Sequence, residues 1–129
     1  MERFILEGSL TTPSVIMDPE TGLIELKGKS IPENSFEFYE PLYEWIRQYS
    51  EQPKDKTKVS LAMEYFNTSS SKEFMKFFKE LEQLHLKGLT AVSVDWYHEE
   101  DDEEMMEMGE SLKKEISVPI EVKSVEEIS

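Results

Sequence analysis

Residues 58–73 read KVSLAMEYFNTSSSKE, a stretch in which an alternating pattern gives way to a cluster of hydroxyl residues. Apolar side chains recur at every second position of 58–66, which is typical of a β-strand with one buried face. The residues on that face are Val59, Leu61, Met63 and Tyr65. After the hydroxyl cluster, apolar residues recur at three- and four-residue spacing, which predicts a helix ending at Lys87-Gly88. Its apolar stripe consists of Phe74, Phe77, Phe78, Leu81 and Leu84. The stretch therefore predicts a strand that leads directly into an amphipathic helix.

Three short apolar runs with strand character precede this unit, at residues 3–7, 14–17 and 23–28. The segment Asp18-Pro19-Glu20-Thr21-Gly22 has the composition of a turn, because Pro fixes φ early and Gly supplies a positive φ late. The second and third runs are therefore expected to pair as an antiparallel hairpin.

A first helix is predicted between the hairpin and residue 50, with Asn34 or Ser35 as a candidate N-cap. Its apolar stripe consists of Phe38, Leu42, Trp45, Ile46 and Tyr49. Pro41 lies inside this pattern. Either Pro41 kinks the helix, or the regular helix begins near residue 40 with Pro41 in its first turn. We favour the second interpretation.

Downstream, residues 90–97 alternate again and predict a strand with Val92, Val94 and Trp96 on one face. The acidic run 99–104 then leads into a third helix, with Asp101 or Asp102 as its N-cap. The apolar residues of that helix are Met105, Met108, Leu112 and Ile116, and Met106 joins them in a methionine cluster expected to pack mainly in the core. Pro119 ends the helix, and a last short strand follows.

The predicted order is β-β-β-α-β-α-β-α-β, which is an α/β fold with an antiparallel N-terminal part. Helices and strands alternate from residue 34 onward, which implies right-handed crossovers onto a largely parallel sheet. A chain of 129 residues predicts one domain over 1–129. Residues 126–129 are expected to form a loose tail.

The charge balance excludes several classes of function. The chain has 14 Lys and Arg against 28 Asp and Glu, a net charge of −14. Nucleic acids and anionic membranes are therefore not expected as partners, whereas basic protein surfaces are. The chain has no Cys, which removes disulfides, thiolate metal sites and cysteine nucleophiles. It has neither the pattern of a signal peptide nor an apolar run of about 20 residues, so we expect a cytoplasmic protein.

The hydroxyl cluster is the strongest candidate site. It lies where a strand ends and a helix begins, and a phosphate on Thr68, Ser69 or Ser70 would be favoured by the unpaired N–H groups and the positive end of the helix dipole. Lys72 is close enough in sequence to help neutralise it. The alternative is simple helix capping, because Ser70 and Glu73 have the S-x-x-E spacing of a capping box. The two interpretations are compatible, since one hydroxyl can cap while its neighbour is modified.

Other chemistry-bearing residues give weaker signals. The acidic run lacks the register of a calcium loop, and His85 and His98 do not have metal-ligand spacing. Asp95 lies inside a strand, either hydrogen-bonded on a polar face or near Thr68 at the end of the sheet. No nucleophile elbow, dinucleotide-binding loop or phosphate-binding loop is present. We therefore expect no metal, no cofactor and no catalytic residue, and the alternative is a small enzyme or metal-binding protein that uses His98, Asp95 and the acidic run.

Several motifs together resemble the SiaC family of bacterial regulatory phosphoproteins. They are Gly22-Leu23-Ile24-Glu25-Leu26-Lys27-Gly28-Lys29-Ser30, Ile31-Pro32-Glu33, Phe38-Tyr39-Glu40-Pro41-Leu42 with Trp45, Glu64-Tyr65-Phe66-Asn67-Thr68-Ser69-Ser70-Ser71-Lys72, and Gly88, Val92, Val94, Trp96-Tyr97 and Met108-Gly109-Glu110. The resemblance spans roughly residues 5–120, and the Y-F-N-T-S-S-x-K block is its most specific part.

The resemblance implies a fold similar to the STAS or anti-sigma-factor-antagonist type and a non-enzymatic phospho-switch. A kinase would phosphorylate Thr68 and a PP2C-type phosphatase would remove the phosphate. The unphosphorylated form would bind and activate a diguanylate cyclase, raising cyclic-di-GMP and biofilm formation. Asn67, Ser69, Ser70 and Lys72 would shape the site, and whether Ser69, Ser70 or Ser71 is also modified stays open. The alternative function is an anti-sigma-factor antagonist, which shares the switch and differs in the partner.

Overall fold

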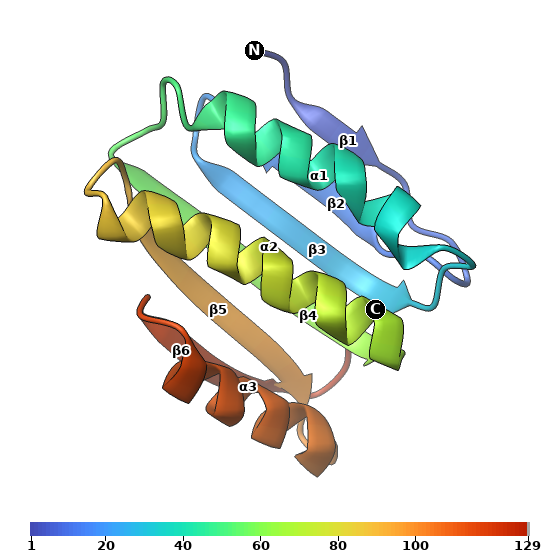
Figure 1. The fold of residues 1–129 in the computed structure, drawn as a ribbon. Helices are drawn as coiled ribbons and strands as arrows, with labels where there is room; N and C mark the ends of the chain where they lie inside the picture. The colour runs from blue at the N-terminus through green and yellow to red at the C-terminus, as the bar shows by residue number, and fades with distance from the viewer. Residues whose placement is uncertain (129) are drawn as a thin grey trace.

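The computed structural model describes residues 1–128, which form one six-stranded mixed sheet and three helices (Figure 1). The elements are β1 (Phe4–Leu6), β2 (Ser14–Asp18), β3 (Leu23–Ser30), α1 (Ser35–Tyr49), β4 (Lys56–Phe66), α2 (Thr68–Leu86), β5 (Ala91–Glu99), α3 (Glu103–Glu115) and β6 (Ile120–Val125). The order of strands and helices predicted from the sequence is confirmed.

The strands lie in the sheet in the order in which they occur along the chain. The pairs β1–β2 and β2–β3 are antiparallel, whereas β3–β4, β4–β5 and β5–β6 are parallel. A parallel pair needs a crossover, and each of the three helices supplies one. The α/β fold class with an antiparallel beginning is therefore confirmed.

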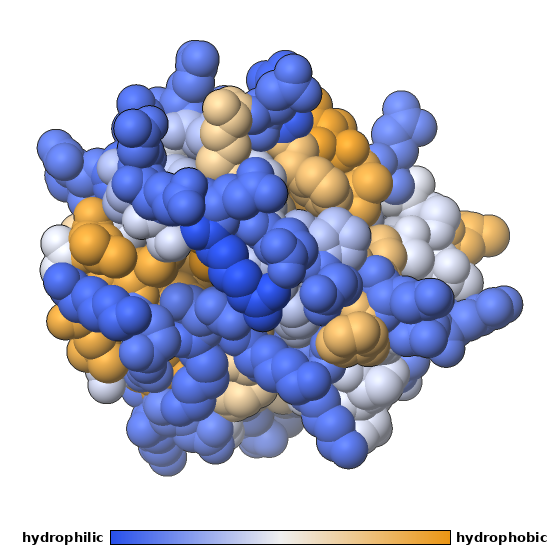
Figure 2. Space-filling model, turned by 45° about the horizontal axis from the view of Figure 1, so that its top comes forward, coloured by the Kyte–Doolittle hydropathy of each residue, from blue (hydrophilic) through white to orange (hydrophobic). Residues whose placement is uncertain are grey.

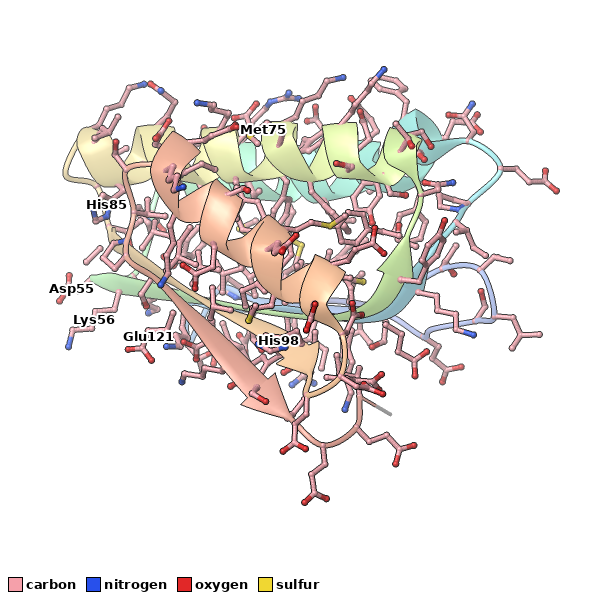
Figure 3. The ribbon with its side chains drawn as sticks, turned by 90° about the horizontal axis from the view of Figure 1, so that it is seen from below. Asp55, Lys56, Met75, His85, His98 and Glu121 are labelled. Carbon is pink, nitrogen blue, oxygen red and sulfur yellow. The ribbon has the colours of Figure 1, made fainter. Side chains whose placement is uncertain are left out.

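The three helices cover one face of the sheet (Figures 1 and 3), whereas the other face carries no helix within residues 1–128 and is covered in part by the C-terminal residues Val125, Glu127 and Ile128. Residues on the covered face are buried, and the predicted stripe of α2 from Phe74 to Leu84 lies entirely in this core. Residues on the open face, such as Glu25 and Ser60, are half-buried. This pattern of buried and half-buried positions is what an alternating strand produces when one of its faces is packed.

The alternation of β4 breaks near its end, and the predicted inward position of Tyr65 is wrong. Gly28 pairs with Met63 and the next residue, Lys29, pairs with Tyr65, so Glu64 is an extra residue on β4. Such a β-bulge reverses the side-chain direction beyond it. Tyr65 is consequently 55% exposed, and Phe66 takes the buried place.

The favoured interpretation of Pro41 is also wrong, because α1 begins at Ser35 and holds Pro41 in its interior. Asn34 is the N-cap, and its side chain accepts a hydrogen bond of 3.0 Å from the N–H of Glu37. An interior proline costs a helix about 3 kcal/mol. Tyr39 and Leu42, which flank Pro41, are completely buried, and their burial offsets that cost.

In α3 the N-cap is Asp102, whose carboxylate accepts from the N–H of Met105 at 3.1 Å. Met105 and Leu112 pack in the core as predicted. Met106 and Met108 do not, because they are 37% and 41% exposed, so the expected core role of the methionine cluster is wrong for these two residues. Gly109 is buried in their place, against the indole of Trp96.

The C-terminal segment was expected to be a loose tail, but it is packed against the rest of the domain at residue 128. Ile128 is 3% exposed, and its N–H donates to the carboxylate of Glu99 at 2.9 Å. Ser129 lies outside the described residues. None of the helices in residues 1–128 combines the length and the apolar character needed to cross a bilayer.

Candidate functional site

The hydroxyl cluster lies where four elements meet. β3 and β4 are parallel, so they end at the same edge of the sheet, and α1 and α2 begin there. The N–H of Asn67 donates to the carbonyl of Ser30 at 3.1 Å, which joins the end of β3 to the start of α2. This edge is where open α/β sheets commonly form sites.

Asn67 is the residue that caps α2. Its side-chain oxygen accepts from the N–H of Ser70 at 2.9 Å and from the hydroxyl of Ser69 at 3.2 Å. The predicted capping box of Ser70 and Glu73 is therefore wrong, since Asn67 already occupies that role. The Glu73 carboxylate instead accepts from the hydroxyl of Tyr43 at 3.2 Å and pairs with Lys76 at 3.1 Å.

Ser70 is completely buried and forms the centre of a polar network. Its hydroxyl donates to the Ser30 carbonyl at 3.0 Å and accepts from the Ser30 hydroxyl at 2.8 Å. The hydroxyl of Tyr39 lies 2.6 Å from that of Ser30, and burial raises the pKa of Tyr39, so it stays a neutral hydrogen-bonding group. Ser69 is linked across the helix interface by a 2.7 Å hydrogen bond to the hydroxyl of Ser35.

Thr68 differs from Ser69 and Ser70 in its contacts. It is the first residue of α2 and, like Ser69, it is exposed. Within residues 1–128 its hydroxyl makes no side-chain hydrogen bond, and Lys72, one turn further along α2, makes no ion pair. The first turn of α2 carries no acidic residue, whereas α1 has Glu37 and α3 has Glu103 and Glu104 in that position. The dipole of α2 therefore meets no compensating carboxylate in its own first turn.

Asp95 lies away from this edge. It pairs in the sheet with Ser60 and Glu121, on the open face, and its carboxylate forms ion pairs of 3.0 Å with Lys58 and 3.2 Å with Lys123. Burial raises the pKa of this carboxyl, but the hydrogen bonds from the two ammonium groups outweigh it and hold the pKa below its usual value. Asp95 is thus the hydrogen-bonded residue that one interpretation predicted, not a neighbour of Thr68.

The two histidines lie far apart (Figure 3). His85 accepts a hydrogen bond of 3.0 Å from the N–H of Val92, near the start of β5. His98 is buried near the end of the same strand, with its Nδ1 2.8 Å from the carbonyl of Glu99. Among the described residues no three His, Asp or Glu side chains are grouped so that they could hold a metal ion.

Two grooves flank α2, and the sequence reasoning found neither because both depend on which helices become neighbours. The α1–α2 groove, of about 530 Å³, carries four basic and two acidic side chains. These are Arg47, Lys72, Lys76 and Lys79, with Glu40 and Glu80. The α2–α3 groove, of about 390 Å³, has an aromatic floor and a rim of Glu104, Glu107 and Glu115. Figure 2 shows a surface of the same mixed kind, with hydrophobic patches set among hydrophilic side chains.

The fold and the cluster together define a small α/β domain whose distinctive chemistry is an exposed hydroxyl at a helix N-terminus, flanked by two grooves of opposite charge. The chain belongs to the SiaC family of regulatory phosphoproteins, whose model matches residues 6–125. The resemblance found in the sequence motifs is therefore confirmed.

Individual relatives agree with this membership. The chain is 28% identical over 127 residues to an uncharacterized protein of Pseudomonas aeruginosa, covering 98% of this chain and 100% of that protein. It is similar to the solved structure of SiaC of Pseudomonas aeruginosa, with a TM-score of 0.88, 26% identity and coverage of 97% of this chain and 100% of that one. It is equally similar, at a TM-score of 0.88, 27% identity and coverage of 95% and 99%, to SiaC in a crystal structure of the diguanylate cyclase SiaD in complex with its activator SiaC.

Proposed function

We propose that this chain is a non-enzymatic phospho-switch that, when unphosphorylated, binds and activates a diguanylate cyclase. The observation that carries the proposal is the likeness over nearly the whole chain to a SiaC solved in complex with the cyclase that it activates. The chain supplies a binding surface and the cyclase supplies the chemistry. We place the switch in a single cytoplasmic domain spanning 1–129.

Thr68 is the proposed phosphoacceptor. A kinase has to reach the hydroxyl, and Thr68 is exposed whereas Ser70 is completely buried. The hydroxyl of Ser69 is held between Ser35 and Asn67. A phosphate on Thr68 would replace no existing side-chain contact and would meet the positive end of the α2 dipole. In this proposal a PP2C-type phosphatase reverses the modification.

Phosphorylation would turn the switch off without unfolding the domain. It adds a charge of about −1.5 to −2 to a neutral surface. A partner that covers Thr68 would have to desolvate that charge or face it with its own carboxylates. Each penalty of about 1.4 kcal/mol weakens binding about tenfold. In this proposal one phosphate on Thr68 releases the partner without a large conformational change.

The first experiment is to incubate the protein with ATP and an extract of its own source, and to locate phosphate by intact mass and fragmentation. We expect a single phosphate on Thr68 that disappears in Thr68→Ala and persists in the matched control Ser69→Ala. An extract that contains the kinase but leaves residues 67–71 unmodified contradicts the switch.

The second experiment measures the partner directly. Purified diguanylate cyclase from the same source should gain activity with unphosphorylated protein or Thr68→Ala, and not with the phosphorylated protein. If the unphosphorylated chain instead captures an anti-sigma-factor kinase and leaves the cyclase inactive, the output is transcription and the cyclase proposal is wrong.

A further inference from the structure

The α1–α2 groove is preformed, because contacts between the two helices join them at several points along its length. The hydroxyls of Ser35 and Ser69 join the two N-termini at 2.7 Å. Further along, the hydroxyl of Tyr43 donates to the carbonyl of Glu73 at 2.8 Å, and Arg47 contacts Glu80 at 3.4 Å. A partner that enters this groove would not have to separate the helices.

The side chains that line this groove are mostly basic, although the molecule as a whole is acidic. The chain carries −14, yet four basic side chains face two acidic ones along this groove. Arg47, Lys76 and Lys79 each pair with a carboxylate. Lys72, at the end nearest Thr68, has no such partner within residues 1–128. Its ammonium group is therefore available to a carboxylate from another molecule.

The same groove offers an apolar contact. Phe36, in the first turn of α1, is 56% exposed, and the ammonium group of Lys76 lies 5.9 Å from the centre of its ring. Met75 of α2, labelled in Figure 3, lies on the ridge between the two grooves and lines both of them. Two apolar side chains lie beside a row of cations in this groove. They could contact the apolar face and the acidic edge of an amphipathic helix, which is the kind of segment that binds in hydrophobic grooves.

Thr68 lies on the ridge of α2 that borders this groove. Residues at three- and four-residue spacing share one face of a helix, so Thr68, Lys72, Met75 and Lys79 form a single row. A phosphate on Thr68 would also be placed to pair with Lys72, since an acidic group four residues before a lysine is the favourable order. Phosphorylation would then add negative charge to the groove and occupy its unpaired cation.

We propose that the effector docks an acidic amphipathic helix in the α1–α2 groove, with carboxylates on Lys72 and its basic neighbours and apolar side chains against Phe36 and Met75. This inference rests on the proposed function, which requires phosphate to release the effector. A basic segment in the acidic α2–α3 groove would be attracted by the phosphate, whereas an acidic segment in the basic groove is repelled by it. Because phosphorylation is proposed to release the effector, the effector is expected to bind the basic α1–α2 groove.

The test measures the affinity of the unphosphorylated protein for purified diguanylate cyclase from its own source. Lys72→Glu should weaken binding by about tenfold or more. The matched control is Lys56→Glu, since Lys56 is also an exposed lysine with no ion pair in the described chain, and it lies at the opposite end of β4 (Figure 3). We expect that control to stay within about twofold, because the length of β4 separates Lys56 from Lys72 by more than the Debye length of about 10 Å.

Two further variants separate the grooves. Phe36→Ala should weaken binding, because the apolar contact is lost, whereas Glu107→Lys in the α2–α3 groove should leave the affinity within about twofold. Raising the salt from about 50 to about 300 mM should weaken the wild-type complex more than the Lys72→Glu complex. Circular dichroism of each variant checks that the fold is kept.

The opposite pattern overturns the inference. If Glu107→Lys weakens binding and Lys72→Glu does not, the effector lies in the α2–α3 groove. If the wild-type protein binds the cyclase and none of these variants changes the affinity, the docking surface lies elsewhere while the proposed function stands. If the wild-type protein does not bind the cyclase at all, the proposed function itself is wrong.

Discussion

The two sides of α2 are built in different ways. Toward α1 the interface is joined by polar contacts, such as the Ser35–Ser69 and Tyr43–Glu73 hydrogen bonds, and the groove above it is basic. Toward α3 the groove has an apolar floor that includes Trp96 of β5, against which Gly109 of α3 packs, and its rim is acidic. Thr68 stands at the head of the helix that separates them. A negative charge added at Thr68 would repel an acidic partner in the α1–α2 groove and attract a basic partner in the α2–α3 groove.

Because the two sides of α2 differ, different substitutions should lower the stability of each side. Polar contacts respond to pH and to the loss of single hydrogen bonds, each with a net value of about 1 kcal/mol. Close apolar packing responds to volume, because a well-filled interior tolerates neither gaps nor added atoms. The free energy of unfolding should therefore depend on hydrogen bonds and pH on the α1 side of α2, and on side-chain volume on the α3 side.

The largest effect is expected on the apolar side, from Gly109→Ala. A Cβ at this position would lie 2.6 Å from the Trp96 ring, which is 3% exposed and held by a 2.9 Å hydrogen bond to the Met105 carbonyl. Overpacking costs about 1–3 kcal/mol, and the better helix propensity of Ala returns at most about 1. We expect urea unfolding to show a net loss of about 1–2 kcal/mol.

The control for this prediction is Ser111→Ala, an exposed position on the same helix. It should change stability by less than about 0.5 kcal/mol. If Gly109→Ala is as stable as the wild type, α3 is free to move away from Trp96 and the apolar side is looser than the structure implies.

On the polar side, Tyr43→Phe should destabilise the protein by about 1 kcal/mol at neutral pH. The substitution removes a buried hydroxyl that donates to the backbone carbonyl and to the carboxylate of Glu73. Tyr65→Phe is the matched control, because Tyr65 is 55% exposed. Equal stability of the two variants in urea unfolding would show that the α1–α2 contact adds nothing to the fold.

The polar side should also respond to alkaline pH. Burial, and then the neighbouring Glu73 carboxylate, raise the pKa of Tyr43. A tyrosine in the unfolded chain ionises near pH 10, so the folded protein resists an ionisation that the unfolded chain undergoes. This contribution to stability is complete below about pH 10 and declines as the pH rises further. The stability difference between wild type and Tyr43→Phe should therefore shrink above about pH 10, as measured by unfolding across pH 8–12.

Most of the fold could be predicted from the sequence because it follows from periodicity, which each strand and helix carries locally. The errors came from contacts between elements. The exposure of Tyr65 depends on a bulge where β4 pairs with β3. The exposure of Met108 depends on how α3 rotates to bring Gly109 against Trp96.

The candidate site shows the same limit. The motif located the hydroxyl cluster, but it did not predict which of its residues caps the helix, which is buried and which is exposed without a side-chain hydrogen bond. The motif places Asn67 only among the residues that shape the site. Asn67 caps α2 because its own backbone, just before Thr68, is extended. That Ser70 is buried depends on Ser30 and Tyr39, from elements far away in the sequence. The opposite charges of the two grooves follow from the order of the helices on the sheet.

The smallest expected effect concerns Thr68 itself, at the boundary between the two sides. Because the first turn of α2 has no acidic residue, a negative charge there should stabilise the helix by about 0.3–1 kcal/mol at low salt. Thr68→Asp should therefore be more stable than the isosteric Thr68→Asn by a few tenths of a kcal/mol. In Lys72→Ala this advantage should shrink, since the carboxylate loses its neighbour four residues on. If Thr68→Asp is instead the less stable of the pair, added charge loosens the start of α2, and release of a partner would follow from local unfolding and not from repulsion at an intact surface.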